Sequence, residues 1–180
     1  MGATGHFKSL SPWALDFLIA NPRLVEWFII MEPKYAELMG GIERVLKQCG
    51  QICPDQMQVR RLVGEWHEPA LDLDKKWRRL QPLVSAEPGN APLAAAVDGG
   101  TMFGPDLGYG PARYLTALEV RSTAAALVAA SPTVLFRAVQ PSAASLTEED
   151  LPYLVTDYRE LADYYELSSV RECAMLQYLM

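Results

Sequence analysis

The chain has 180 residues, of which 50% are hydrophobic and 21% are charged, so it has the composition of a globular protein with a buried core. Its formal net charge of -6 arises in residues 141–180, which hold eight acidic and two basic side chains, whereas residues 1–140 are balanced. Nucleic acids and anionic membrane surfaces are bound by clustered Lys and Arg. Because the sequence has no such excess, we expect neither as a partner.

The apolar stretches and the cysteines indicate a cytoplasmic protein. Stretches such as residues 24–31 are shorter than the ~20 residues of a membrane span, so no transmembrane helix is expected. Residues 1–8 lack the pattern of a secretory signal. The three cysteines, Cys49, Cys53 and Cys173, are an odd number, which suits a reducing compartment better than a disulfide framework.

Two short helices are predicted near the amino terminus. Ser11-Pro12 combines a side-chain cap with a proline at the first helical position, which predicts a helix over 12–20. Asn21-Pro22 repeats this pattern ahead of apolar residues at helical spacing. A third segment follows from Pro33 to Leu46, where two adjacent glycines argue against an unbroken helix.

The middle of the chain predicts further helices and a rigid loop. Asp72 or Asp74 is expected to cap a helix whose apolar positions begin at Trp77. A loop over 85–90, a short helix over 92–97 and a turn over 98–100 follow. Residues 103–113 contain three glycines and two prolines, which predict an ordered loop.

The last third predicts two capped helices and a strand. Residues 112–115 are expected to form a strand. Thr116 with Glu119, and Thr147 with Asp150, match the capping box that opens a helix. Residues 174–179 predict the final strand. We therefore expect one α+β domain over residues 1–180, mainly helical, with a small sheet that includes the first and last strands.

Few residues indicate catalysis or metal binding. Cys49 and Cys53 have a plausible ligand spacing, but the chain offers too few other Cys and His for structural zinc, so no metal is expected. His67 follows Glu65 and precedes Glu68, yet a solvated loop explains it better than a catalytic base. Nucleophile elbows and nucleotide-binding glycine motifs are absent from the sequence. No cofactor is expected.

Two candidate sites remain. The loop over 104–113 offers an aromatic face, an arginine and close backbone approach, so a ligand cleft could gather five side chains: Asp74, Trp77, Asp98, Tyr109 and Arg113. The alternative is a structural turn against the Trp77 helix, with Arg113 paired to an acid of that helix. A concave pocket would favour the cleft, and a buried Asp74–Arg113 pair without a cavity would favour the structural turn.

The second candidate is an anionic docking surface on the last helix. Acids in a first helical turn stabilise the helix dipole, but tyrosine is enriched in protein interfaces, and the two kinds of residue alternate here. The predicted partner-binding residues are Glu148, Glu149, Asp150, Asp157, Tyr158 and Tyr165. The expected partner is a protein with a basic surface, and the oligomeric state is left open.

Three stretches resemble the YfbM-like family of bacterial domains of unknown function. They are Met1-Gly2, residues 71–77 with the string Leu-Asp-Leu-Asp-Lys-Lys-Trp, and residues 108–120 with Gly-Tyr-Gly-Pro-Ala-Arg; residues 92–100 fit between them. The resemblance implies a compact α+β fold but no mechanism. Gln81 stands where family members often carry histidine, which weakens an enzymatic interpretation. We therefore favour a non-enzymatic binding protein, regulatory or immunity-like, with a small-molecule enzyme as the alternative.

Overall fold

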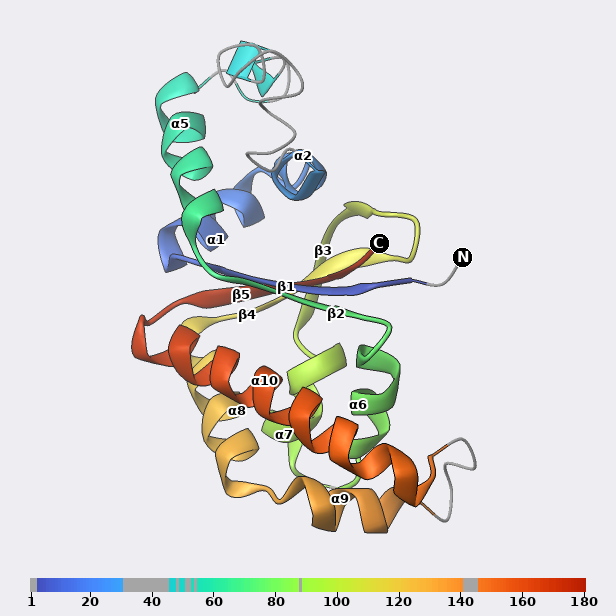
Figure 1. Cartoon of the computed structure of the whole chain (residues 1–180). Coiled ribbons are helices and arrows are strands. Elements are labelled where there is room, and N and C mark those ends of the chain that lie inside the picture. Colours follow the sequence, from blue (N-terminus) through green and yellow to red (C-terminus); the bar gives the residue numbers. More distant parts are fainter. Residues whose placement is uncertain are drawn as a thin grey trace.

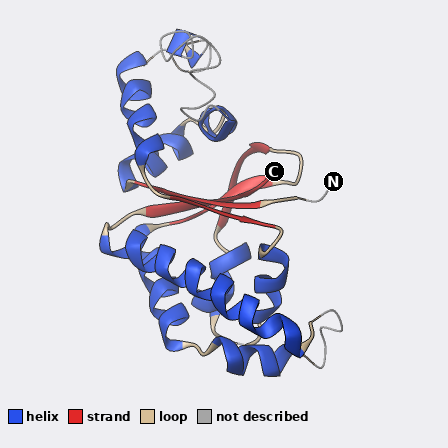
Figure 2. Ribbon diagram, in the orientation of Figure 1, coloured by secondary structure: helices blue, strands red, loops and turns tan. Residues whose placement is uncertain are grey.

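A computed structural model describes residues 3–30, 46–47, 49–50, 53, 55–87, 89–140 and 146–180 of the chain. The predicted segment from Pro33 to Leu46 lies almost wholly outside these residues. Figure 2 shows one twisted sheet with helices on both of its faces. This confirms the predicted α+β class.

The sheet has the strand order β2-β1-β5-β4-β3 and all its pairs are antiparallel. Its strands are β1 (Gly5–Leu10), β2 (Ala70–Asp74), β3 (Thr101–Asp106), β4 (Pro111–Leu115) and β5 (Ala174–Leu179). β1 and β5 pair along their whole length, from Gly5 opposite Leu179 to Leu10 opposite Ala174. The predicted sheet that includes the first and last strands is therefore confirmed. Both described chain ends lie at one end of it (Figure 1).

Helices from two parts of the chain cover the two faces (Figure 1). One face, called here the α1 face, is covered by α1 (Pro12–Ala20), α2 (Leu24–Ile30) and α5 (Gln56–Gly64), with the short helix η1 (Glu65–His67) leading into β2. The other, called the α10 face, is covered by α6 (Trp77–Val84), α7 (Ala91–Asp98), α8 (Ala117–Ala129), α9 (Pro132–Val139) and α10 (Leu151–Val170), with η2 (Glu148–Asp150) before α10.

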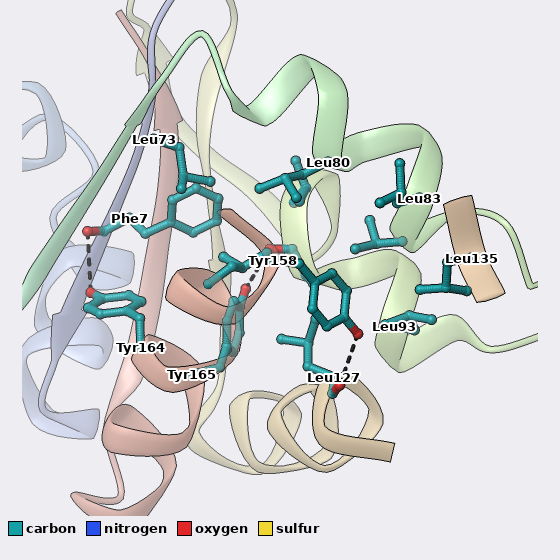
Figure 3. Packing of buried hydrophobic residues seen from close by; sticks show 14 of the residues in the cluster. Phe7, Leu73, Leu80, Leu83, Leu93, Leu127, Leu135, Tyr158, Tyr164 and Tyr165 are labelled. Carbon is teal, nitrogen blue, oxygen red and sulfur yellow. Dashed lines mark hydrogen bonds between the residues drawn. The ribbon is translucent and has the colours of Figure 1, made fainter. Parts of the chain in front are cut away.

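Alternation along the strands divides the buried side chains into two cores. In β1, Phe7 packs on the α10 face and Leu10 on the α1 face, because successive residues of a strand point to opposite sides. In β5, Met175 and Leu176 divide in the same way. Figure 3 shows the core of the α10 face, where Leu80 and Leu83 of α6 meet the tyrosines of α10.

Three of the predicted helix starts are confirmed, whereas Asn21 is the C-cap of α1 and α2 begins only at Leu24. The Ser11 side chain accepts from Ala14 N, and α1 spans the predicted residues. Thr116 and Glu119 form a capping box at the start of α8. Thr147 and Asp150 form the same motif, which opens η2 and leads into α10. Local side-chain chemistry therefore fixes where these helices begin.

Two segments differ from their predictions. Residues 70–74 form β2, and α6 begins after Lys76 without a side-chain cap, so neither Asp72 nor Asp74 caps it. The alternation of Leu71, Asp72 and Leu73 is the period of a half-buried strand, and it decides the structure here. Residues 103–113 are a β-hairpin, β3 and β4, joined by a tight turn rather than a loop throughout. The separate helix α9 was not predicted.

None of the helices that the structure describes is both long and apolar enough to cross a membrane. Only α8 and α9 taken together meet that test, and they are bent by 84° where they join.

Candidate functional site

A pocket of about 200 Å³ opens at the end of the sheet where the β3–β4 hairpin turns, on the α10 face. Its floor comes from alternate residues of the strands, Gly5, Phe7, Gln177, Leu179 and Arg113, with Met102 on β3. Its walls are the first residue of α6, the last turn of α7 and the hairpin turn: Trp77, Val97, Asp98, Tyr109, Gly110 and Pro111. His6 and Tyr178 complete the lining.

The Trp77 wall depends on a glycine in the neighbouring strand. The indole Nε1 donates to the carbonyl oxygen of Ala3 at 3.1 Å, which holds the ring against β1. A β-carbon at Gly5 would lie 2.8 Å from Cγ of Trp77 and 2.9 Å from its Cβ and Cδ1. Only glycine therefore allows the indole to lie this close to the strand.

The hairpin turn is shaped by one carboxylate. Oδ1 of Asp106 accepts from Gly108 N at 2.7 Å and from Gly110 N at 3.0 Å. Both glycines have φ near +100°, a conformation that a side chain would strain. The turn presents Tyr109, with 53% of its surface exposed, at the mouth of the pocket. The glycine-rich string predicted as a site therefore forms one rim of the cavity.

Arg113 is oriented by a chain of two polar side chains. Its Nε lies 3.3 Å from Oδ1 of Asp98, the last residue of α7. The other oxygen of Asp98 accepts from Gln81 Nε2 at 3.2 Å. Among the residues described, no partner contacts the terminal nitrogens of Arg113. The guanidinium is thus held through one nitrogen and leaves two for a ligand.

Gln177, on the central strand β5, is the uncharged polar residue of the floor, and the sequence analysis missed it. The side chain is 4% exposed, and Nε2 donates to Ala95 O at 2.9 Å and to the phenol oxygen of Tyr165 at 2.8 Å. Its carbonyl oxygen Oε1 has no hydrogen-bond partner among the described atoms. The signal was present in the sequence: Gln177 is the one polar residue in the apolar strand 174–179.

The pocket brings together four of the five predicted cleft residues. Trp77, Asp98, Tyr109 and Arg113 line it, and a role for them in ligand binding stays a prediction. Asp74 does not line it; it lies exposed at the end of β2, where its φ is +46° and its N–H donates to Asp72. The alternative pairing with an acid of the Trp77 helix is wrong, because Asp98 belongs to α7.

The predicted acidic docking surface needs correction. Tyr158 and Tyr165 are 2% and 0% exposed, and their hydroxyls donate to Leu127 O and Ala96 O in the core. Figure 3 shows both rings among the leucines of the α10 face. They lie on the apolar side of α10, because the helical period that makes the stripe turns them toward the sheet. Neither ring is available to a partner.

Asp157 is also removed from that surface. It is 5% exposed and lies 3.3 Å from Nζ of Lys76 and 3.3 Å from Nη2 of Arg79. Lys76 also contacts Glu160 at 3.2 Å, and hydrogen bonds to both carboxylates raise its pKa. Lys76 and Arg79, at the start of α6, therefore neutralise Asp157 and Glu160 of α10 within the fold.

Three residues of the predicted surface remain near solvent. The N–H and hydroxyl of Thr147 donate to Asp150 and lower the pKa of its carboxyl group, so that residue has a structural role as a cap. Glu148 and Glu149 are exposed. The predicted partner with a basic surface now depends on these two side chains.

The other candidate residues show no site. His67 is exposed at the end of η1. Cys49 and Cys53 are buried. Burial, and to a lesser extent the neighbouring Cys53 thiol, raise the pKa of Cys49 to about 11. Burial also raises the pKa of Cys173, so the thiols of Cys49 and Cys173 stay protonated at neutral pH. Within the described ranges, no group of three or more His, Cys, Asp or Glu side chains is placed to hold a metal ion.

An antiparallel sheet between two helical layers, with a small pocket at one end, defines an α+β protein with a candidate ligand site. The chain belongs to the family described as a domain of unknown function, DUF1877, whose model matches residues 1–178. Its fold is similar to that of a protein of unknown function, YfbM from Escherichia coli, with a TM-score of 0.55 and 14% identity over 98% of this chain and 99% of that chain. At this identity the likeness shows the fold alone. No curated protein matches the sequence.

Proposed function

We propose that this protein binds a small molecule in the pocket beside the hairpin turn. The observation that carries the proposal is the convergence of an indole, a phenol and an oriented guanidinium, from Trp77, Tyr109 and Arg113, on one cavity whose floor includes Gln177. They come from α6, the turn of the β3–β4 hairpin, β4 and β5. Ligand sites combine apolar walls with a few convergent polar groups in this way.

The size of the cavity limits the ligand. Drug-sized ligands occupy pockets of ~300–1,000 Å³, and this one measures about 200 Å³. The ligand is therefore a small metabolite rather than a nucleotide or a peptide. We therefore assign the binding function predicted from the sequence to the pocket beside the Gly-Tyr-Gly-Pro-Ala-Arg string and not to the acidic helix.

The chemistry of the lining favours binding over covalent catalysis. Its described residues include no Ser, Thr, Cys or Lys that could act as a nucleophile. Asp98 is already occupied by Arg113 and Gln81. The polar groups of the pocket are suited to orienting a ligand.

A thermal-shift screen against a library of small polar metabolites tests the proposal. A compound at 100 times its Kd stabilises the native state by about 2.7 kcal/mol, which for a chain of this size raises the Tm by about 5–10 °C. Met102, which lines the pocket and is 59% exposed, offers a blocking variant, Met102→Trp. Met57→Trp is the matched control, because Met57 is 82% exposed on α5 and lies outside the lining.

We expect hits that stabilise the wild type and Met57→Trp but not Met102→Trp. The proposal fails if no compound stabilises the wild type, or if every hit stabilises the blocked variant equally well.

A further inference from the structure

The side chain of Arg113 lies on the pocket side of the sheet. Its neighbours in β4, Ala112 and Tyr114, pack on the core of the α1 face. Because successive residues of a strand point to opposite sides, Arg113 lies on the α10 face, where it is half-buried and lines the pocket. Asp98 contacts Nε, and within the part of the chain that the structure describes Nη1 and Nη2 have no hydrogen-bond partner. These two nitrogens present the fork that a planar carboxylate fits with two parallel hydrogen bonds.

The charge of the pocket limits the ligand to one negative charge. Among the described residues of the lining, Arg113 is the only Lys or Arg, and Asp98 offsets part of its charge. His6 and Tyr178 are paired across β1 and β5 and their rings are stacked. Tyr178 packs in the core of the α1 face, so both rings lie on the far side of the sheet from the pocket. This balance suits a monoanion better than the two charges of a phosphate group.

An apolar stretch of floor separates the guanidinium from the indole of Trp77. Leu179 is half-buried on β5, and alternation from Tyr178 places it on the α10 face. The strands β4 and β1 flank β5, and neighbouring strands lie ~4.7–4.9 Å apart, so these two are roughly 9–10 Å apart. Arg113 stands on β4, and the indole packs on β1 at Gly5. A ligand that contacts both side chains therefore needs an apolar body between them, over Leu179.

We propose that the pocket recognises a small monocarboxylate with an apolar body, with the carboxylate on Nη1 and Nη2 of Arg113 and the body over Leu179 against Trp77. This inference rests on the proposed function, because it names the chemical class that the same pocket binds. It makes Arg113 the residue that selects the charge of the ligand, and Leu179 and Trp77 the residues that contact its body.

Matched pairs of probes test the inference by ligand-observed NMR and calorimetry. The pairs are butanoate, hexanoate, benzoate and phenylacetate, each with its neutral primary amide. Acetate, which has the charge but only a methyl group as its body, and inorganic phosphate are additional probes. For at least one body, we expect the acid to bind about tenfold more tightly than its amide, because hydrogen bonds between two charged groups are stronger than those to a neutral group. The same acid is expected to bind more tightly than acetate and phosphate.

Two substitutions assign the two contacts, with circular dichroism to show that each variant is folded. Arg113→Met should remove the preference for the acid over the amide, while Arg121→Met, which breaks an exposed ion pair with Glu172 outside the lining, should preserve it. Leu179→Ala should weaken the acid and the amide alike by about tenfold and leave the preference unchanged. Leu167→Ala is the matched control, because Leu167 is exposed on α10 and lies outside the lining.

The inference is overturned if no acid binds the wild type more tightly than its amide, if Arg113→Met retains the preference, or if Leu179→Ala leaves the affinities unchanged. If a variant does not fold, the comparison of acid, amide and acetate in the wild type still decides. If library compounds bind and are blocked by Met102→Trp while the acids show no preference, the proposed function stands without this ligand class. If nothing binds in the pocket, both fail.

Discussion

Replacing Gly5 by alanine perturbs the contact between β1 and the Trp77 wall. The added methyl carbon would lie 2.8–2.9 Å from Cγ, Cβ and Cδ1 of the indole side chain. These are its near atoms, so rotation of the far end of the ring does not relieve the overlap. The hydrogen bond from Nε1 to Ala3 O further restrains the ring.

The magnitude follows from the cost of overpacking. Inserting a methyl group into a tight contact costs about 1–3 kcal/mol, which corresponds to a fall in Tm of about 2–12 °C for a chain of this length. Gly64→Ala is the matched control. Gly64 is the last residue of α5, and a β-carbon there meets nothing within 4 Å. Alanine at that position should stabilise the protein by up to about 1 kcal/mol.

Urea unfolding followed by circular dichroism gives both free energies, and tryptophan fluorescence reports the displacement of the indole. The two substitutions should change stability in opposite directions. Equal effects for Gly5→Ala and Gly64→Ala would refute the close packing of Trp77 on β1, and with it the geometry of the pocket wall.

Three further predictions concern the α10 face. Asp157→Asn should lower the free energy of unfolding, measured in urea, by about 1–3 kcal/mol. This is less than the ~3–5 kcal/mol lost when a fully buried ion pair is broken, because the side chains of Lys76 and Arg79 are 40% and 39% exposed and can turn to water. Glu149→Gln is the control and should change the free energy of unfolding by less than about 0.5 kcal/mol. Thr116→Ala should lower the free energy of unfolding by about 1 kcal/mol, because it removes the capping box of α8. Ser122→Ala, in the same helix, is the control, and an equal loss in both variants would contradict this prediction. Burial raises the pKa of Tyr158 to about 12 and also raises the pKa of Tyr164 and Tyr165. Because the folded pKa lies above the unfolded value, the stability that these neutral, buried phenols contribute is present below pH 10 and is lost as the pH rises from 10 toward 12. Phenolate absorbance should therefore show the three tyrosines ionising together with unfolding, not before it.

Local signals in the sequence predicted the helix starts well. Ser11, Thr116 and Thr147 each make the predicted capping bond, because a cap depends on residues only three positions away. The hairpin and β2 were missed because strands are stabilised by partners distant in sequence. The four residues 71–74 carry both a possible cap and a strand alternation, and pairing with β1 decides between them.

The sequence predicted only part of the candidate site, because residues distant in sequence also contribute to it. Trp77, Tyr109 and Arg113 stand out by residue type, and the structure brings them to one pocket. Gln177 did not stand out, since its importance comes from burial beside Tyr165 and Ala95. The acidic helix was misjudged because composition counts carboxylates and tyrosines without showing which side of α10 they occupy. Asp157 and Tyr158 are adjacent in sequence and both are buried.

The pairing of β1 with β5 has a consequence for the order in which the molecule is completed. Thr4 and Met180 exchange backbone hydrogen bonds, at 2.7 and 3.1 Å, across a separation of 176 residues. Contacts between such distant segments form late, because the intervening chain must be synthesised and its ends brought together first. The floor of the pocket combines Gly5 and Phe7 from β1 with Gln177 from β5. A chain that has not yet been synthesised through β5 therefore lacks part of the floor of the pocket.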